Sequence, residues 1–312
     1  MVATEDLELI EKIISNRLIE ESEVQIDSTE KVAVCTPMYN TNIDGILPEF
    51  LYHLLHLDYQ KDLLSLHFTI QGNDNTIDVL RSLKSSFGDE YRKITIDRVE
   101  QKIGGDAPHV ENVVNCRNVL AEEGHPHNVL FMDHDNFPPP YAIHRLQRAA
   151  KYGGDIAGAV YLHQKRNKSN PSLPMILGFT AFFRYSGKYY HLAFHRDGDL
   201  GTFYAPLLGR MVFTNAIGMG TTLVQRKVLD DVEFYVPYDT NMTDDTAFCE
   251  VAVKKGYKII ADFGLFIPHW GIIADKKWER DGVAGYDLRV ERKFNDRRLK
   301  MKNDGVYFRK GT

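Results

Sequence analysis

Strand-like and helix-like patterns alternate regularly between residues 31 and 160, and this alternation constrains the fold more than any other feature of the sequence. Short runs of apolar residues, or of apolar residues alternating with polar ones, predict strands at residues 31–36, 64–70, 94–96, 128–132 and 155–160. Helical patterns separate them, at residues 43–57, 75–87, 110–124 and 138–153. Strands that alternate with helices build a mostly parallel sheet with helices on both faces. The sequence therefore predicts an α/β fold with a Rossmann-like, mostly parallel central sheet.

Length and composition narrow the class of protein. With 312 residues, 43% of them hydrophobic, the chain can bury one large core. A net charge of -5 argues against general nucleic-acid binding. Cys35, Cys116 and Cys249 have no metal-ligand spacing, which indicates reduced, buried thiols. The sequence has neither an apolar run of membrane-spanning length nor a signal-peptide pattern, so we expect a cytoplasmic protein, with peripheral attachment to a membrane left open.

The chain divides into three expected regions. Residues 1–30 place apolar side chains at helical spacing between acidic residues, which predicts an N-terminal amphipathic helix and a polar connector. We expect this helix to pack on the domain rather than to dock on a partner or a membrane, because its polar face is acidic. Residues 31–275 form the main domain, with halves at 31–160 and 161–275. Residues 276–312 form a basic extension, which could be a solvated end, fold over a bound anion or face an anionic surface.

The predicted strand at residues 128–132 ends in two carboxylates, Asp133 and Asp135. In an open α/β sheet, ligands bind at the carboxyl ends of the strands. Two carboxylates on alternating residues can share one divalent cation, and hard oxygen ligands suit Mg²⁺ or Mn²⁺. Such a cation is what a diphosphate group needs. His134 lies between the two aspartates, and we expect it to point to the opposite side of the chain.

Polar and aromatic residues also follow the first strand, where Thr36, Pro37, Tyr39 and Asn40 occur within five positions. We expect Pro37 to end strand pairing and Tyr39 to offer an aromatic face at the ligand edge of the sheet. An ordinary exit from strand to loop is the alternative for this segment.

The next strand and the helix before Asp133 add three further candidates. Asn73 and Asp74 follow the second strand, where their polar groups could bind a nucleobase, cap the next helix, or do both. Arg117 lies on the predicted helix before Asp133, and it could pair with a phosphate or with a carboxylate of the protein.

The second half contributes glycines, acidic residues and a histidine. Gly218 and Gly220 could let the backbone approach a ligand closely or could form a tight bend. Asp244 and Asp245 open a predicted helix, where Thr243 or Asp244 would be the N-cap and the helix dipole favours acidic residues. That position would also bring Asp245 to the ligand edge of the sheet. His269, beside a tryptophan, could be a metal ligand or a structural histidine.

Taken in order, these segments resemble a known enzyme family. Thr-Pro-Met-Tyr-Asn follows the first strand, Arg-Asn lies on a helix, an apolar strand ends in Asp-x-Asp, and an Asp-Asp helix comes later. This order is similar to that of nucleotide-sugar-dependent glycosyltransferases of the GT-A fold, in particular the inverting enzymes of family 2, over about residues 31–270. Asp244 stands where the family has glutamate. The resemblance implies that residues 31–160 bind the nucleotide sugar and that residues 161–275 form the acceptor side.

The resemblance also implies a reaction and its residues. A sugar would move from a nucleoside-diphosphate sugar, with UDP favoured over GDP, to an acceptor hydroxyl. Asp135 and His269 would bind Mn²⁺ or Mg²⁺ together with Asp133, and Asp245 would be the general base of an inverting displacement. Gly218 and Gly220 would line the acceptor side. Donor contacts would come from Thr36, Pro37, Tyr39, Asn40, Asn73, Asp74, Arg117, Asp133 and Asp244.

Two alternatives remain open at the level of sequence. A retaining GT-A glycosyltransferase would use the same metal site, and an inactive nucleotide- or glycan-binding protein could use the same scaffold. A nucleotidyltransferase is disfavoured, because no glycine-rich phosphate loop follows the first strand. The acceptor could be a glycan, a lipid-linked molecule, a protein or a small molecule.

Overall fold

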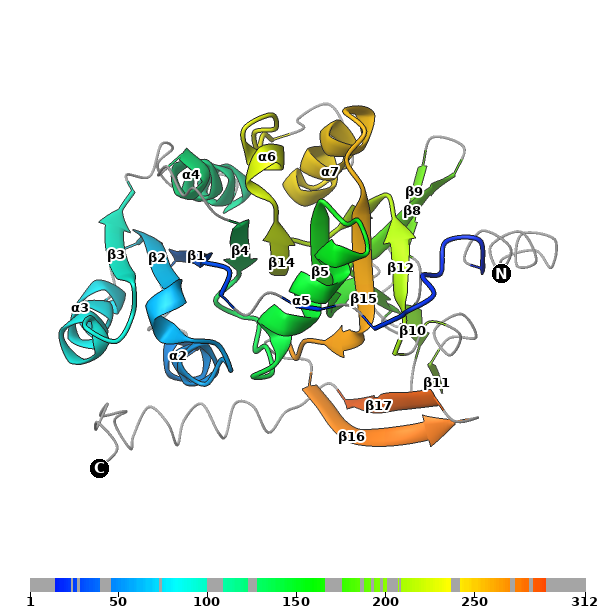
Figure 1. Ribbon diagram of the computed structural model, residues 1–312, viewed down its shortest axis with the longest axis horizontal. Coiled ribbons are helices and arrows are strands. Elements are labelled where there is room, and N and C mark those ends of the chain that lie inside the picture. The colour runs from blue at the N-terminus through cyan, green and yellow to red at the C-terminus, as the bar shows by residue number, and fades with distance from the viewer. Residues whose placement is uncertain are drawn as a thin grey trace.

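An eight-stranded sheet in the order β12-β15-β5-β14-β4-β1-β2-β3 forms the centre of the molecule (Figure 1). The computed structural model describes residues 15–23, 25–26, 29–39, 46–72, 75–99, 109–122, 128–165, 176–185, 188–191, 194–196, 199–200, 207, 209–236, 242–269, 273–280 and 283–289. The elements of the first half are β1 Val32–Tyr39, α2 Leu47–Leu55, the short 3₁₀ helix Lys61–Leu63, β2 Leu64–Gln71, α3 Thr76–Phe87, β3 Lys93–Arg98, α4 His109–Glu122, β4 Asn128–Met132, α5 Ala142–Lys151 and β5 Ile156–Val160.

The central sheet confirms the predicted fold class. β3, β2, β1 and β4 run parallel, and so do β5 and β15 (Ile259–Phe266). β14 (Thr221–Val224) joins the two parallel parts as an antiparallel strand, and β12 (Met211–Thr214) is an antiparallel edge. Helices α4, α6 (Arg226–Leu229) and α7 (Asp244–Lys254) lie on one face, and α2, α3 and α5 lie on the other (Figure 1).

Smaller sheets and a hairpin account for the remaining strands. β11, β10, β7 and β6 form one sheet, β13, β8 and β9 form a second, and β16 pairs with β17. Their bounds are β6 Leu162–Lys165, β7 Ile176–Phe179, β8 Ala181–Tyr185, β9 Lys188–His191, β10 Phe194–Arg196, β11 Asp199–Leu200, β13 Ala216–Ile217, β16 Ile273–Arg280 and β17 Val283–Arg289.

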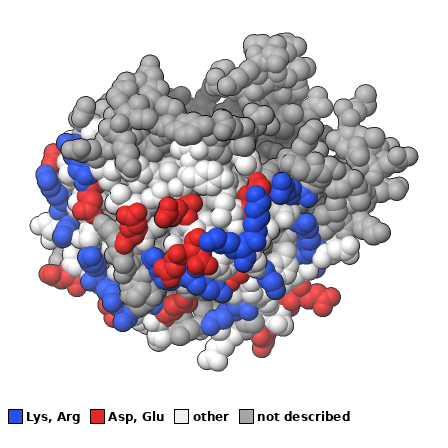
Figure 2. All heavy atoms as spheres, turned by 90° about the horizontal axis from the view of Figure 1, so that it is seen from above, with Lys and Arg blue, Asp and Glu red and all other residues white. Residues whose placement is uncertain are grey.

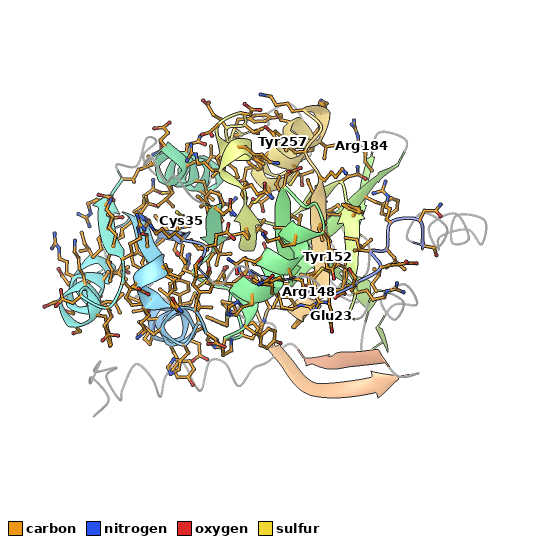
Figure 3. The ribbon with its side chains drawn as sticks, viewed as in Figure 1. Glu23, Cys35, Arg148, Tyr152, Arg184 and Tyr257 are labelled. Atoms are coloured by element: carbon orange, nitrogen blue, oxygen red, sulfur yellow. The ribbon has the colours of Figure 1, made fainter. Side chains whose placement is uncertain are left out.

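Each face of the central sheet has its own core. On β4, Val129 and Phe131 belong to the cluster that includes side chains of α4 and α7, whereas Leu130 and Met132 belong to the cluster with α2, α3 and α5. Successive side chains of a strand point to opposite faces, so a strand covered on both faces needs an unbroken apolar run. This requirement explains the run at residues 128–132. Cys35, Cys116 and Cys249 are also buried and not disulfide-bonded, as predicted, and Figure 3 labels Cys35 within β1.

The expectation that Pro37 ends strand pairing is wrong for one of the two neighbouring strands, β2, with which β1 stays paired. β1 pairs with β4 only as far as Cys35, but it continues alongside β2 through Pro37 to Tyr39, opposite Gln71. Beyond Cys35 this strand has a single neighbour, and proline is tolerated at such an edge position. The extra length carries Tyr39 past the end of β4.

The N-terminal segment departs from the predicted helix at Leu18. This residue forms a β-bridge with Val212, and Ile19 donates its N–H to the carbonyl oxygen of Met211 at 3.0 Å. The segment therefore covers the edge strand β12, whose backbone groups would otherwise lack partners. The rest of the predicted helix, residues 1–14, lies outside the described residues.

Residues that follow this bridge are held against α5. Arg148 forms an ion pair with Glu21 at 3.4 Å, and both Arg148 and Tyr152 donate hydrogen bonds to the carbonyl oxygen of Ser22. Figure 3 labels Glu23, Arg148 and Tyr152 in the same region of the view. Residues 18–22 thus pack on the domain, and the packing of the predicted helix itself stays a prediction.

The face above α4, α6 and α7 carries interspersed acidic and basic side chains in its described part (Figure 2). Arg226 pairs with Asp230 at 2.7 Å, and Lys254 pairs with Glu250 at 2.8 Å. Mixed signs of this kind do not form a continuous basic footprint for nucleic acid. Among the residues that the structure describes, no helix is long and apolar enough to span a membrane.

Candidate active site

A pocket lies at the carboxyl ends of β1, β2 and β4, where the sequence predicts ligand binding. It is lined by Pro37, Met38, Tyr39, Gln71, Val113, Cys116, Asp133, His134 and Asp135. Four predicted site residues are thus brought together: Pro37, Tyr39, Asp133 and Asp135. Thr36 is fully buried in β1 and is not among the lining residues. Asn40, Asn73 and Asp74 lie outside the described residues, so their roles stay predictions.

A turn after β4 orients the Asp-x-Asp segment. Asp133 donates its N–H to the carbonyl oxygen of Gly220 at 2.8 Å, and Asn136 donates to the carbonyl oxygen of Asp133 at 3.1 Å. His134 lines the same pocket as the two aspartates, with Nδ1 3.1 Å from the Pro37 carbonyl oxygen. The expectation that His134 points away is therefore wrong. It assumed strand alternation, but β4 ends at Met132 and the chain turns.

Asp135 and His269 meet although 134 positions separate them in the sequence. His269 Nε2 lies 3.2 Å from Asp135 Oδ2, and Asn136 donates a hydrogen bond to Asp135 Oδ1 at 3.0 Å. Burial would lower the pKa of His269, but the Asp135 charge raises it overall. Burial would likewise raise the pKa of Asp135, but the His269 charge holds it below the usual value. The pair is therefore a charge-assisted contact at the rim of the pocket.

The chemistry of this pair fits a divalent cation. Two neighbouring ligands on an octahedral ion lie about 3.0 Å apart when each bond is about 2.1 Å long, and the Nε2–Oδ2 separation is 3.2 Å. His269 Nδ1 is buried without a hydrogen-bond partner among the described residues, so only Nε2 faces the site. No group of three or more His, Cys, Asp or Glu side chains in the described part of the chain is arranged to hold a metal. A divalent cation held here would therefore have two ligands, Asp135 and His269, among the described residues.

Arg117 binds three carboxylates at once. Its Nη2 donates to both oxygens of Asp133, at 3.2 and 3.1 Å. Its Nη1 donates to Asp244 Oδ2 at 2.6 Å and to Asp245 Oδ1. The arginine is only 3% exposed. Burial alone would lower the pKa of Arg117, but the three carboxylates raise it well above its usual value. Of the two predicted partners, a carboxylate or a phosphate, the structure shows carboxylates.

Asp244 and Asp245 form the first turn of α7, as predicted. Thr243 is the N-cap, since its Oγ1 accepts the N–H of Thr246 at 3.3 Å. Asp245 Oδ2 accepts the N–H of Met219 at 3.1 Å, which fixes the carboxylate toward the glycine segment. Burial, followed by the charge of Asp245, raises the pKa of Asp244 to about 6. Burial also raises the pKa of Asp245, although the Arg117 charge opposes the shift.

Gly218 and Gly220 pack against Tyr161, a residue that the sequence reasoning missed. A Cβ on Gly218 would lie 2.5 Å from the Tyr161 hydroxyl oxygen, and one on Gly220 would lie 2.8 Å from the same atom. Gly220 donates its N–H to that hydroxyl at 3.2 Å. The Tyr161 ring also stacks on His269, with centroids 5.5 Å apart. Tyr161 directly follows β5, and the strand-end rule that singled out Asp133 would have found it.

Comparison with known proteins identifies the fold. No protein-family model and no curated protein matches the sequence. A solved structure of the mannosyltransferase PcManGT from Pyrobaculum calidifontis, in complex with GDP-Man and Mn²⁺, shares 15% identity at a TM-score of 0.53, over 84% of this chain and 63% of that one. TarS from S. aureus, residues 1–349, shares 15% identity at a TM-score of 0.45, over 76% of this chain and 60% of that one. This chain therefore spans less than two thirds of either protein. The likeness to the mannosyltransferase shows that the chain has the GT-A-type fold that the sequence resemblance predicted.

Proposed function

We propose that this protein is a metal-dependent glycosyltransferase that moves a sugar from a nucleoside-diphosphate sugar to an acceptor hydroxyl with inversion. One observation carries the proposal. The pocket at the carboxyl ends of β1, β2 and β4 includes Asp135, which pairs with His269, and it includes Asp133, which shares the guanidinium of Arg117 with the half-buried Asp245. A donor, a cation and a base are the components that such a transfer requires.

The charges around the pocket indicate that a diphosphate donor would bind together with a cation. Asp133 and Asp135 line the pocket and Asp244 and Asp245 lie behind Arg117, so four carboxylates face only two cationic side chains, Arg117 and His269. An anionic diphosphate would be repelled by this arrangement unless a cation bound with it. A divalent cation held by Asp135 and His269 would supply Lewis-acid stabilisation of the negative charge on the departing diphosphate. Tyr39 would offer its ring to the nucleobase, and Asp133 would accept hydrogen bonds from the ribose.

Asp245 is the proposed general base. Burial raises its pKa, so its carboxylate is a stronger base than an ordinary aspartate. The Met219 N–H holds one of its oxygens, and its side chain is 20% exposed, compared with 11% for Asp244. Asp245 would take the proton of the acceptor hydroxyl while that oxygen bonds to the anomeric carbon. The bond from the anomeric carbon to the diphosphate breaks in the same step, which inverts the configuration.

Both UDP and GDP sugars belong in the test. The sequence resemblance favours UDP, whereas the mannosyltransferase of like fold was solved with GDP-Man and Mn²⁺. We therefore propose a panel of UDP and GDP sugars, each scored for release of the nucleoside diphosphate with Mn²⁺, with Mg²⁺ and with a chelator. We expect turnover with at least one donor and its loss on chelation.

Variants then separate catalysis from binding. Asp135→Asn and Asp245→Asn should each lower turnover by at least about a hundredfold while the protein stays folded. Asp78→Asn, on the exposed surface of α3, is the matched control and should leave turnover unchanged. Nucleotide binding without turnover of any donor would identify a binding protein instead. Retention of the donor configuration, measured by NMR of the product anomer, would rule out Asp245 as the base.

A further inference from the structure

Arg117 hydrogen-bonds carboxylates from two parts of the site, only one of which lines the pocket. Asp133 lines the donor pocket, whereas Asp244 and Asp245 are not among its lining residues. Nη2 of Arg117 binds the pocket carboxylate, and Nη1 of the same side chain binds the two carboxylates of α7. Among the described residues, the guanidinium of Arg117 hydrogen-bonds both a pocket carboxylate and the proposed base, whereas the other connection, from Asp133 through Gly220 and Met219 to Asp245, runs along the backbone.

The surroundings leave this guanidinium little freedom to move. Arg117 is 3% exposed, and its guanidinium lies 5.6 Å from the centre of the Phe234 ring. A guanidinium is planar and rigid, so its two terminal nitrogens cannot move independently. If the guanidinium follows Asp133 when a ligand draws that carboxylate toward itself, the hydrogen bonds at Nη1 change together with those at Nη2.

Asp133, Asp244 and Asp245 compete for the single positive charge of Arg117. Three carboxylates share one cation, so none of them is neutralised fully. When one carboxylate loses its charge, Arg117 can bind the others more closely. A change at Asp245 therefore alters the carboxylate that faces the donor, even though Asp245 is not among the residues that line the pocket.

We propose that Arg117 is a positioning residue that couples occupancy of the donor pocket to the placement of Asp245, through its shared hydrogen bonds to Asp133 and Asp245. This inference rests on the proposed function, because it takes the pocket as the nucleotide site. Its consequence is that donor binding and alignment of the base are one linked event.

A double-mutant cycle on nucleotide affinity tests the coupling without turnover. Binding of UDP and of GDP, each with Mn²⁺, is measured by titration calorimetry for the wild type, Asp245→Asn, Arg117→Met and the double variant. We expect Asp245→Asn to change nucleotide affinity at least about threefold, within the range measured for residues of one network. In the Arg117→Met background, the same substitution should change affinity by less than about twofold.

Other outcomes distinguish this proposal from a purely electrostatic or structural role. An undiminished effect of Asp245→Asn in the Arg117→Met background would mean that the charge acts through space, and it would overturn the proposal. No effect of Asp245→Asn in the wild-type background would overturn it as well. Failure of both nucleotides to bind the wild type would overturn the proposed function, and the coupling with it.

Two further variants keep the test interpretable. If Arg117→Met does not fold, Arg117→Lys replaces it, because one ammonium keeps the charge but cannot reproduce the fork that reaches three carboxylates. Arg145→Met is the matched control, since it removes another arginine that pairs with a buried carboxylate, Asp262, which lies outside the pocket lining. In that background, the effect of Asp245→Asn on nucleotide affinity should stay at its wild-type size.

Discussion

Replacing Gly218 by alanine tests why this position is a glycine. A Cβ built there would lie 2.5 Å from the Tyr161 hydroxyl oxygen and 3.0 Å from Thr180 Cβ. The backbone cannot yield easily, because Gly218 donates its N–H to the Thr180 carbonyl oxygen at 2.8 Å and accepts from Thr222 Oγ1 at 2.8 Å. Tyr161 and Thr180 are 6% and 5% exposed, so neither side chain has free space to enter.

The magnitude follows from these contacts. Adding atoms to a well-packed site destabilises a protein by about 1–3 kcal/mol, and we expect about 2 kcal/mol for Gly218→Ala. Tyr161→Phe removes the closest oxygen, and its own effect should be about 1 kcal/mol, from the lost hydrogen bond with the Gly220 N–H. In the Tyr161→Phe background the alanine meets nothing nearer than 3.0 Å. Its effect on the free energy of unfolding should then fall to about 1 kcal/mol or less.

Urea denaturation of the wild type, Gly218→Ala, Tyr161→Phe and the double variant at one pH measures both numbers. Gly220→Ala is the matched control, because its Cβ would meet Asn136 Nδ2 at 2.6 Å as well as the Tyr161 hydroxyl at 2.8 Å. Tyr161→Phe removes only one of these two contacts. It should therefore restore less of the stability lost in Gly220→Ala than of the stability lost in Gly218→Ala. A Gly218→Ala protein within about 0.5 kcal/mol of the wild type would refute the packing argument. Unchanged stability with impaired use of the acceptor would instead support the acceptor-side role that the sequence suggests.

Three further predictions concern the metal pair, a buried ion pair and pH. His269→Gln should weaken Mn²⁺ binding, followed by electron paramagnetic resonance, at least about tenfold, and equal affinity would exclude His269 as a ligand. Arg145→Met should lower the free energy of unfolding by about 3 kcal/mol, because it leaves the buried Asp262 carboxylate uncompensated. An unchanged urea midpoint would contradict that. The raised Asp244 pKa of about 6 means that the folded state holds a proton that the unfolded state releases nearer pH 4, so this group's contribution to stability falls as the pH rises between those values. Asp244→Asn should therefore make the pH dependence of unfolding in that window more positive, and an unchanged slope would argue against the assignment.

Local patterns were sufficient for the alternating strands and helices between residues 31 and 160, and for several site positions. The unbroken apolar run of β4 follows from burial on both faces, and the aspartates after it lie at the pocket because strand ends meet at one edge of the sheet. Asp245 was also placed correctly at the start of α7, since the N-cap chemistry of Thr243 depends only on neighbouring residues. These features depend on short stretches of chain, which a sequence displays directly.

The tertiary structure decided which of these groups meet. Arg117 could have bound a phosphate or a carboxylate, and the fold selected three carboxylates, two of them more than 120 positions away. His134 turned into the pocket because β4 ended before it, and Leu18 joined β12 because that edge strand needed a partner. Such outcomes depend on segments that are distant in sequence, on where a strand stops and on which backbone groups remain to be satisfied. The sequence by itself determined the alternating strands and helices between residues 31 and 160 and most of the candidate residues, and only the packing of the chain decided their partners.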